Sequence, residues 1–242
     1  MFSKSQIKLI NSLAQKKYRL KHQLFLVEGI KAIQELLKSS LRLHSLYTTK
    51  DIFETGKDST FIISEAELKK ISRLTTPQTA LAVFHIPETI KPSTEDLIIA
   101  LDEVQDPGNL GTIIRLCDWF GINNLVCSSG TVDCYNPKVV QATMGSIARV
   151  NIYYTDLPDF LKEMKGKMPI IGAFLEGQNV YKEDLPSKAV LIMGNEANGI
   201  SSEVAQFINE KLLIPQFGMI QKTESLNVAT ATAILLSEFR RR

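Results

Sequence analysis

Apolar residues recur along the chain in two patterns, which change at about residue 90. In the first part of the chain, short runs at 24–29, 43–49 and 79–86 predict strands. The segment 30–39 has apolar residues every three or four positions, which predicts an amphipathic helix. A first helix is expected after Ser3, and 64–72 has the pattern of a capped helix. The stretch 87–96 carries two prolines among polar residues, as linkers do. We therefore predict a small mixed α/β domain over 1–90, with a linker to about 96.

From residue 97 on, strand and helix patterns alternate regularly. Six predominantly apolar runs, which predict strands, lie at 97–104, 124–129, 150–155, 169–175, 189–194 and 211–215. Candidate helices cover 109–120, 137–147, 156–164 and 200–209, and a last helix follows Ser225. This alternation predicts a parallel sheet covered by helices on both faces, in a second α/β domain over 97–242. Ligands of such sheets bind in the loops at the carboxyl ends of the strands.

Composition limits the class of protein. Hydrophobic residues make up 44% of the 242 residues, which is ordinary for a core-forming chain. No run approaches the roughly 20 apolar residues of a membrane span, and the N-terminal segment lacks the apolar centre of a secretion signal. Three cysteines without a C-x-x-C pair argue against a disulfide framework or a zinc site and favour the cytoplasm. We expect no metal site, because the three histidines are scattered: His22, His44 and His85.

Charge is distributed unevenly. The net charge is +2, but residues 1–90 carry 14 Lys and Arg against 8 Asp and Glu, and residues 91–242 carry 14 against 18. The first 27 residues contain six basic residues and no acidic one. Lys16, Lys17, Arg19 and Lys21 in this block could bind RNA phosphates. A solvated helix face is the equally open alternative.

Three polar loops of the second domain are candidates for one site. In the first, a turn at 106–108 leads into a helix that carries Asn109 and Arg115, six residues or about 9 Å apart along the axis. Arg115 could clamp a phosphate through its planar guanidinium. Taken alone, the helix favours the alternative, a surface arginine that pairs with Asp118 three residues further on.

The second loop places Glu196 between Gly194 and Gly199, with Ser201 as the expected cap of the next helix. An acid at this position does not fit a dinucleotide fingerprint, and the G-K-[ST] of a phosphate loop is missing. The loop therefore favours a neutral or cationic ligand.

In the third loop, Ile214 and Pro215 end a strand, and Ser225 and Asn227 flank the start of the last helix. Their side chains could only cap the helix, or they could present a hydroxyl and an amide to a substrate.

Taken in order, the three loops resemble the motifs of a known family. N-x-x-x-x-x-R, G-x-E-x-x-G, and I-P followed by S-L-N-V are similar to the three motifs of the SpoU-type RNA 2′-O-ribose methyltransferases, the TrmH family of the SPOUT superfamily. This resemblance covers 97–242. Residues 16–85, with FLVEGIKAIQELL and TTPQTALAVF, resemble the ribosomal-protein-like substrate-binding domain that precedes the enzyme domain in many members.

The resemblance implies a parallel-sheet SPOUT domain with a deep trefoil knot, S-adenosylmethionine as cofactor, and a homodimer formed through the knot and the C-terminal helix. It places Asn109, Arg115, Glu196, Ser225 and Asn227 in the catalytic site, with Arg115 also contacting RNA. The cofactor-binding residues that it implies are Met193, Gly194, Asn195, Gly199, Ile214 and Leu226.

The front domain favours ribosomal RNA over transfer RNA as the substrate. A non-catalytic RNA-binding protein remains the alternative from another class. A guanidinium is a poor general base, so a phosphate clamp is the safer role for Arg115. The segment 216–224, with Lys222, Thr223 and Glu224, is a few residues longer than in the better-known members. We expect it to close over the cofactor and the target ribose.

Overall fold

The computed structural model describes residues 2–218 and 225–241, and the chain forms two compact units. Unit 1 consists of Met1–Glu88 and Asp133–Ala148. Unit 2 consists of Thr89–Val132 and Arg149–Arg242. Residues 133–148 thus pack in unit 1, although they lie in the sequence between two strands of unit 2.

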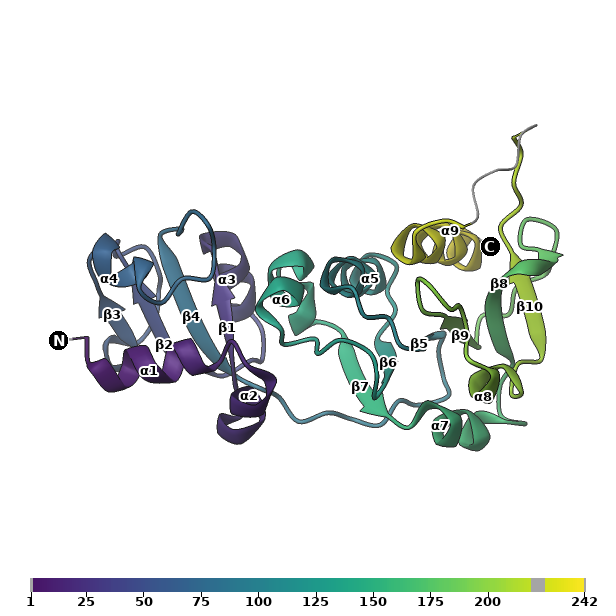
Figure 1. Cartoon of the computed structure of the whole chain (residues 1–242), viewed down its shortest axis with the longest axis horizontal. Coiled ribbons are helices and arrows are strands. Elements are labelled where there is room, and N and C mark those ends of the chain that lie inside the picture. Colours follow the sequence, from purple (N-terminus) through teal and green to yellow (C-terminus); the bar gives the residue numbers. More distant parts are fainter. Residues whose placement is uncertain (1, 219–224, 242) are drawn as a thin grey trace. The chain divides into compact units, whose positions relative to one another are not determined.

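Unit 1 is built on a four-stranded sheet (Figure 1). Its strands have the order β1-β4-β2-β3, and only the pair of β2 and β3 is parallel. The three strands predicted from apolar runs are confirmed, and a three-residue strand joins them at the edge. The strands are β1 (Leu24–Glu28), β2 (Leu43–Thr48), β3 (Thr60–Ile62) and β4 (Ala80–His85).

Two helices of unit 1 begin at a capping box. Ser3 accepts a hydrogen bond from the backbone N–H of Gln6, whose side chain accepts one from the Ser3 N–H, so the predicted first helix begins with a capping box. Ser64 and Glu67 form the same arrangement. The helices are α1 (Lys4–Ser12), α2 (Lys16–His22), α3 (Ile30–Leu37), α4 (Glu65–Lys69) and α6 (Pro137–Thr143), with 3-10 turns at η1 (Lys57–Ser59) and η2 (Ser146–Ala148).

Arg19 of α2 is a structural residue, which corrects its assignment to the RNA-binding block. Its side chain is only 3% exposed and forms an ion pair with Asp133. Nη1 also donates to the carbonyl oxygens of Leu13 and Ala14, at 2.8 and 2.9 Å. The guanidinium is buried because residues 133–148 cover it and supply the opposite charge. Lys16, Lys17 and Lys21 are exposed, and their binding to RNA stays a prediction.

Unit 2 contains a six-stranded sheet in which every paired strand is parallel. The order is β10-β8-β9-β5-β6-β7. This confirms the predicted parallel sheet. The strands are β5 (Ile98–Leu101), β6 (Asn124–Ser128), β7 (Asn151–Thr155), β8 (Ile170–Asn179), β9 (Val190–Met193) and β10 (Glu210–Leu213).

Helices cover both faces of this sheet (Figure 1). α7 (Leu157–Met164) and α8 (Ser202–Ala205) pack on one face, in a cluster that includes Ile98 and Ile192. α5 (Pro107–Trp119) and α9 (Val228–Arg241) lie side by side on the other. The helix predicted over 200–209 is wrong in length. After Ala205 the chain continues in tighter i→i+3 turns, which let Phe207 and Ile208 pack against the core.

Two absences hold for the described residues. None of their helices is both long and apolar enough to span a membrane. No three His, Cys, Asp or Glu residues among them are grouped as a metal site would require. The path toward the C-terminus passes through 219–224, which lies outside the described residues, so the trefoil knot stays a prediction.

Candidate active site

The first loop of the site is fixed by a helix cap. Asp106 precedes α5, and its Oδ1 accepts a hydrogen bond from the backbone N–H of Asn109 at 2.8 Å. Pro107 occupies the first helical turn, where its missing N–H costs nothing. The turn therefore places Asn109 at the carboxyl edge of the sheet, because α5 directly follows the loop after β5.

Asn109 connects all three loops by hydrogen bonds. Its Nδ2 donates to Oε1 of Glu196 at 2.9 Å, and its Oδ1 accepts from Nδ2 of Asn227 at 2.8 Å. Oδ1 of Asn227 accepts from the backbone N–H groups of Ala229 and Thr230, which caps α9. The cap predicted for Asn227 is confirmed, and its nitrogen donates to Asn109; a contact of this amide with substrate stays a prediction.

The orientation of these amides follows from the contacts. Backbone N–H groups occupy the oxygen of Asn227, so its nitrogen must face Asn109. Asn109 must then turn its own oxygen toward Asn227 and its nitrogen toward the carboxylate of Glu196. Each donor meets an acceptor in only one arrangement, and the three side chains form a directional chain.

The loop after β9 is a tight turn closed by Asn195 and Gly199, whose backbones exchange two hydrogen bonds of 2.9 Å. A Cβ on Gly194 would lie 2.3 Å from the carbonyl carbon of Gly199, so only glycine fits there. Gly199 has φ +68°, the left-handed region that favours glycine. The side chain of Asn195 donates to the carbonyl oxygen of Glu103 at 2.7 Å, which ties this turn to the loop after β5.

A buried carboxylate, not predicted from the sequence as part of the site, holds the same two loops together. Asp102, directly after β5, accepts a hydrogen bond from the backbone N–H of Ser201 at 2.7 Å. Ser201 in turn caps α8, as expected. The next residue, Glu103, has φ +57°, which is uncommon for a residue other than glycine. In the sequence, this contact between Asp102 and Ser201 is signalled only by the acidic pair Asp102 and Glu103 after an apolar strand.

Arg115 lies on the exposed surface of α5. It forms no hydrogen bond or ion pair with any described residue. The alternative that it pairs with Asp118 is wrong, because Asp118 forms an ion pair with Arg149 at 2.8 Å. Arg115 thus presents an unneutralised positive charge six residues, or less than two helical turns, from Asn109.

The third loop reaches the site immediately before α9. Ile214 follows β10 and is half-buried, Ser225 is exposed, and Leu226 exposes 47% of its surface. The predicted contacts of Lys222, Thr223 and Glu224 lie outside the described residues. Residues 225–227 are nonetheless anchored, because the Asn227 amide caps α9 and also contacts Asn109.

The far end of α9 is attached to α5 as well. Arg240 donates from Nε to the carbonyl oxygen of Phe120 and from Nη2 to that of Gly121, at 2.9 and 2.8 Å. These carbonyls end α5, where a cation is favourable for the helix dipole. The two helices that carry Asn109, Arg115 and Asn227 therefore contact each other at both ends.

Solved structures share this fold over the whole chain. An AdoMet-bound rRNA methyltransferase from Sinorhizobium meliloti is 31% identical, with a TM-score of 0.86 over 99% of this chain and 96% of that chain. A protein from Porphyromonas gingivalis assigned to the TrmH family of RNA methyltransferases is 44% identical, with a TM-score of 0.91 over 100% and 99%. The fold and the three-loop site thus define an RNA methyltransferase with a separate substrate-binding domain.

Within that class, the chain belongs to the SpoU rRNA Methylase family, whose model matches residues 96–237. A second model, the MRM3-like substrate binding domain, matches residues 4–82. The 23S rRNA (guanosine(2553)-2′-O)-methyltransferase RlmP of Bacillus subtilis (strain 168) is 33% identical over 242 aligned residues, 97% of this chain and 96% of its own length. The predicted resemblance to the SpoU-type methyltransferases is confirmed.

Proposed function

We propose that the protein transfers a methyl group from S-adenosylmethionine to the 2′-hydroxyl of a ribose in ribosomal RNA. Its membership of the SpoU family, the ribosomal substrate of the Bacillus relative and the cofactor bound to the Sinorhizobium protein support this. The observation that carries the proposal is the hydrogen-bonded chain of Glu196, Asn109 and Asn227 near the unneutralised Arg115.

The chain's own groups fit the cofactor. Gly199 leaves open space where a Cβ would stand, so a ligand can approach the backbone of that turn. Leu226 offers exposed apolar surface to a flat ring, and the Glu196 carboxylate suits a cationic sulfonium. Bound S-adenosylmethionine supplies an electrophilic methyl group. The cofactor-binding set that we propose is Met193, Gly194, Asn195, Gly199, Ile214 and Leu226.

The catalytic side chains act mainly by positioning. Arg115 holds the phosphate next to the target ribose, and Asn109 fixes the direction of the Glu196 carboxylate. Ser225 and Asn227 order the ribose side of the site. Holding the reactants in line removes much of the barrier, since alignment alone contributes up to about 7–11 kcal/mol in intramolecular reactions. Arg115 does not act as the base, because its guanidinium keeps its proton.

We further propose that the enzyme is a cytoplasmic homodimer that associates through the C-terminal helix and the predicted knot. Trp119, the last residue of α5 and close to the α9 contact, is 84% exposed, which a covering subunit would explain. The three cysteines are buried thiols that form no disulfide with one another, in keeping with a reducing compartment. Analytical ultracentrifugation of the wild type and of Trp119→Gln tests the dimer, and a monomeric wild type would refute it.

The proposed reaction is tested by incorporation of labelled methyl groups. Purified protein is incubated with labelled S-adenosylmethionine and, separately, with unmodified ribosomal RNA and unmodified transfer RNA. We expect label in ribosomal RNA at an alkali-resistant ribose position. Label in transfer RNA alone would change the substrate class. Absence of label together with absence of cofactor binding by calorimetry would leave a non-catalytic RNA-binding protein.

A further inference from the structure

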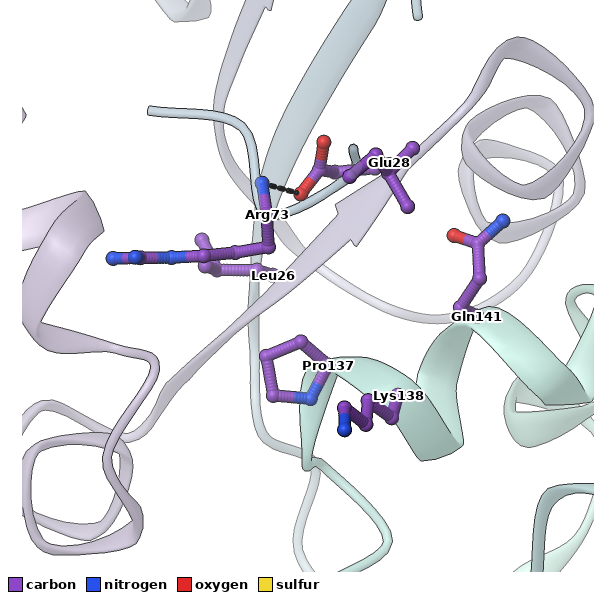
Figure 2. A pocket seen from close by; sticks show the side chains of 7 residues that line it. Leu26, Glu28, Arg73, Pro137, Lys138 and Gln141 are labelled. Atoms are coloured by element: carbon purple, nitrogen blue, oxygen red, sulfur yellow. Dashed lines mark hydrogen bonds between the residues drawn. The ribbon is translucent and has the colours of Figure 1, made fainter. Parts of the chain in front are cut away.

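Unit 1 contains a cavity that the active site does not use. It has a volume of about 220 Å³ and lies between strand β1, the loop after α4 and helix α6 (Figure 2). All of its lining residues belong to unit 1, and three of them come from the segment 133–148. The lining residues are Leu26, Glu28, Arg73, Leu74, Pro137, Lys138 and Gln141.

The walls combine apolar surface with two positive charges. Leu26, Leu74 and the ring of Pro137 supply the apolar part. Arg73 is fixed at the wall, because Nη2 donates to the backbone oxygen of Asn11 at 2.7 Å and to its Oδ1 at 3.0 Å. These partners are neutral, and with the carboxylate of Glu28 in the same wall the lining keeps a net positive charge. Lys138 forms no ion pair with any described residue.

Two further side chains of the wall, Glu28 and Gln141, can form hydrogen bonds with the polar edge of a ligand. Glu28 is 8% exposed, and its carboxylate accepts from the Ser72 hydroxyl and from the backbone N–H of Arg73 (Figure 2). An ionised carboxylate has about four acceptor positions, so others remain. Gln141 offers both a donor and an acceptor, and its side chain forms no hydrogen bond with a described residue.

The volume suits a single nucleobase. Pockets for drug-sized ligands usually measure about 300–1,000 Å³, and a water in the liquid occupies about 30 Å³. A flat heterocycle falls between these limits and needs apolar walls with a few polar groups at its edge. A phosphate attached to it needs cations at the rim, which Arg73 and Lys138 supply.

We propose that this cavity binds one unpaired nucleotide of the substrate RNA, other than the nucleotide that is methylated. The inference rests on the proposed function for the identity of the RNA. Single-stranded RNA is commonly recognised in this way, by an unstacked base in a pocket and phosphates on cations. Residues 133–148 then act as part of the RNA-binding surface, beyond the 4–82 that the substrate-binding domain model matches.

Two variants separate the cavity from general electrostatics. Lys138→Gln removes one phosphate contact, and Gln141→Phe fills the cavity without changing charge. Their matched controls are Lys162→Gln, on the exposed surface of α7, and Gln34→Phe, on the exposed surface of α3. Circular dichroism and thermal unfolding show whether each variant folds.

The experiment measures binding to an in vitro transcript of large-subunit ribosomal RNA between 50 and 200 mM salt. We expect Lys138→Gln to reduce the slope of log K against log salt by about 0.7. We expect Gln141→Phe to weaken binding about 5-fold or more with an unchanged slope, because the added ring occupies the space of the base beside Leu26, Leu74 and Pro137. The turnover number at saturating RNA should stay at the wild-type value in both.

Binding by both variants that equals binding by their controls would overturn the proposal, as would a wild type that does not bind the transcript. The binding assay needs no methyl transfer, so it tests the cavity even where methylation fails. Conversely, methylation by the wild type with normal binding by both variants would leave the enzyme function standing and remove the cavity from it.

Discussion

The substitution Asn227→Asp tests the directional chain of the active site. Asn227 keeps its capping oxygen in this change, so α9 still begins at the same residue. What is lost is the donor to Asn109. The Asn109 amide then lies between two carboxylates, and it can turn its nitrogen to only one of them. Its oxygen must face the other, so either the contact with Glu196 or the contact with residue 227 becomes repulsive.

The expected magnitude follows from the exposure of the site. A hydrogen bond contributes about 0.5–1.5 kcal/mol net, and these side chains are partly solvated, so the free energy of unfolding should fall by only about 1 kcal/mol. That lowers Tm by about 2–4 °C in a chain of this size. The turnover number should fall about 100-fold, because a displacement of about 1 Å in a positioning group costs that much.

Initial methylation rates at saturating RNA and cofactor, together with thermal unfolding, measure both effects. The matched control is Asn209→Asp, at the opposite edge of the same sheet, where the side-chain oxygen accepts from the backbone N–H of Ile170. It should keep the wild-type turnover number. A folded Asn227→Asp protein with a turnover number within about 2-fold of the wild type would refute the role of this chain.

Four further predictions test other parts of the structure. Arg115→Ala should reduce methylation at least about 100-fold while calorimetry shows unchanged cofactor binding, because the guanidinium has no described partner to lose; wild-type activity would contradict the assignment. Gly194→Ala should lower the unfolding free energy by about 1–3 kcal/mol and abolish cofactor binding, since its Cβ would collide with backbone across the turn; calorimetry and thermal unfolding check this. Arg19→Met should cost about 3–5 kcal/mol in denaturant unfolding, because it leaves the Asp133 carboxylate, which is only 15% exposed, without its cation; a change below about 1 kcal/mol would contradict it. Burial, and then the nearby Arg42, lower the pKa of His44 and of His85 below the ordinary value of 6.5. As the pH falls, the unfolded chain therefore binds protons before the folded chain does, and the free energy of unfolding decreases below that pH. Replacing both histidines by Gln should flatten the dependence of Tm on pH between about 7 and 5.

The strands and the site loops were predictable from the sequence because their signals are local. A run such as 189–194 is apolar at every position, which only a strand buried on both faces requires. The start of a helix was predictable where a capping residue precedes it, as at Ser3 and Ser64. Asn109, Glu196 and Asn227 were identified from the order of three motifs, and the hydrogen bonds that join them depend on the folded sheet.

Other features depend on contacts between distant segments, which periodicity does not record. Arg19 has the sequence context of a solvated basic helix, and only the arrival of Asp133 explains its burial. The helix expected over 200–209 shortens because Phe207 and Ile208 are drawn into the core. The hydrogen bond between Asp102 and Ser201 joins residues 99 positions apart, and any polar residue could end a strand at the position of Asp102.

The placement of residues 133–148 bears on how such enzymes exchange parts during evolution. The segment is encoded in the middle of the methyltransferase domain, yet its Asp133 neutralises Arg19, and its Tyr135 ring packs on Phe25 at 4.7 Å. A gene fusion that replaced only residues 1–88 would leave this segment facing a foreign surface and an unmatched charge. In this chain the unit that would have to be exchanged as a whole is therefore discontinuous: it consists of residues 1–88 together with residues 133–148.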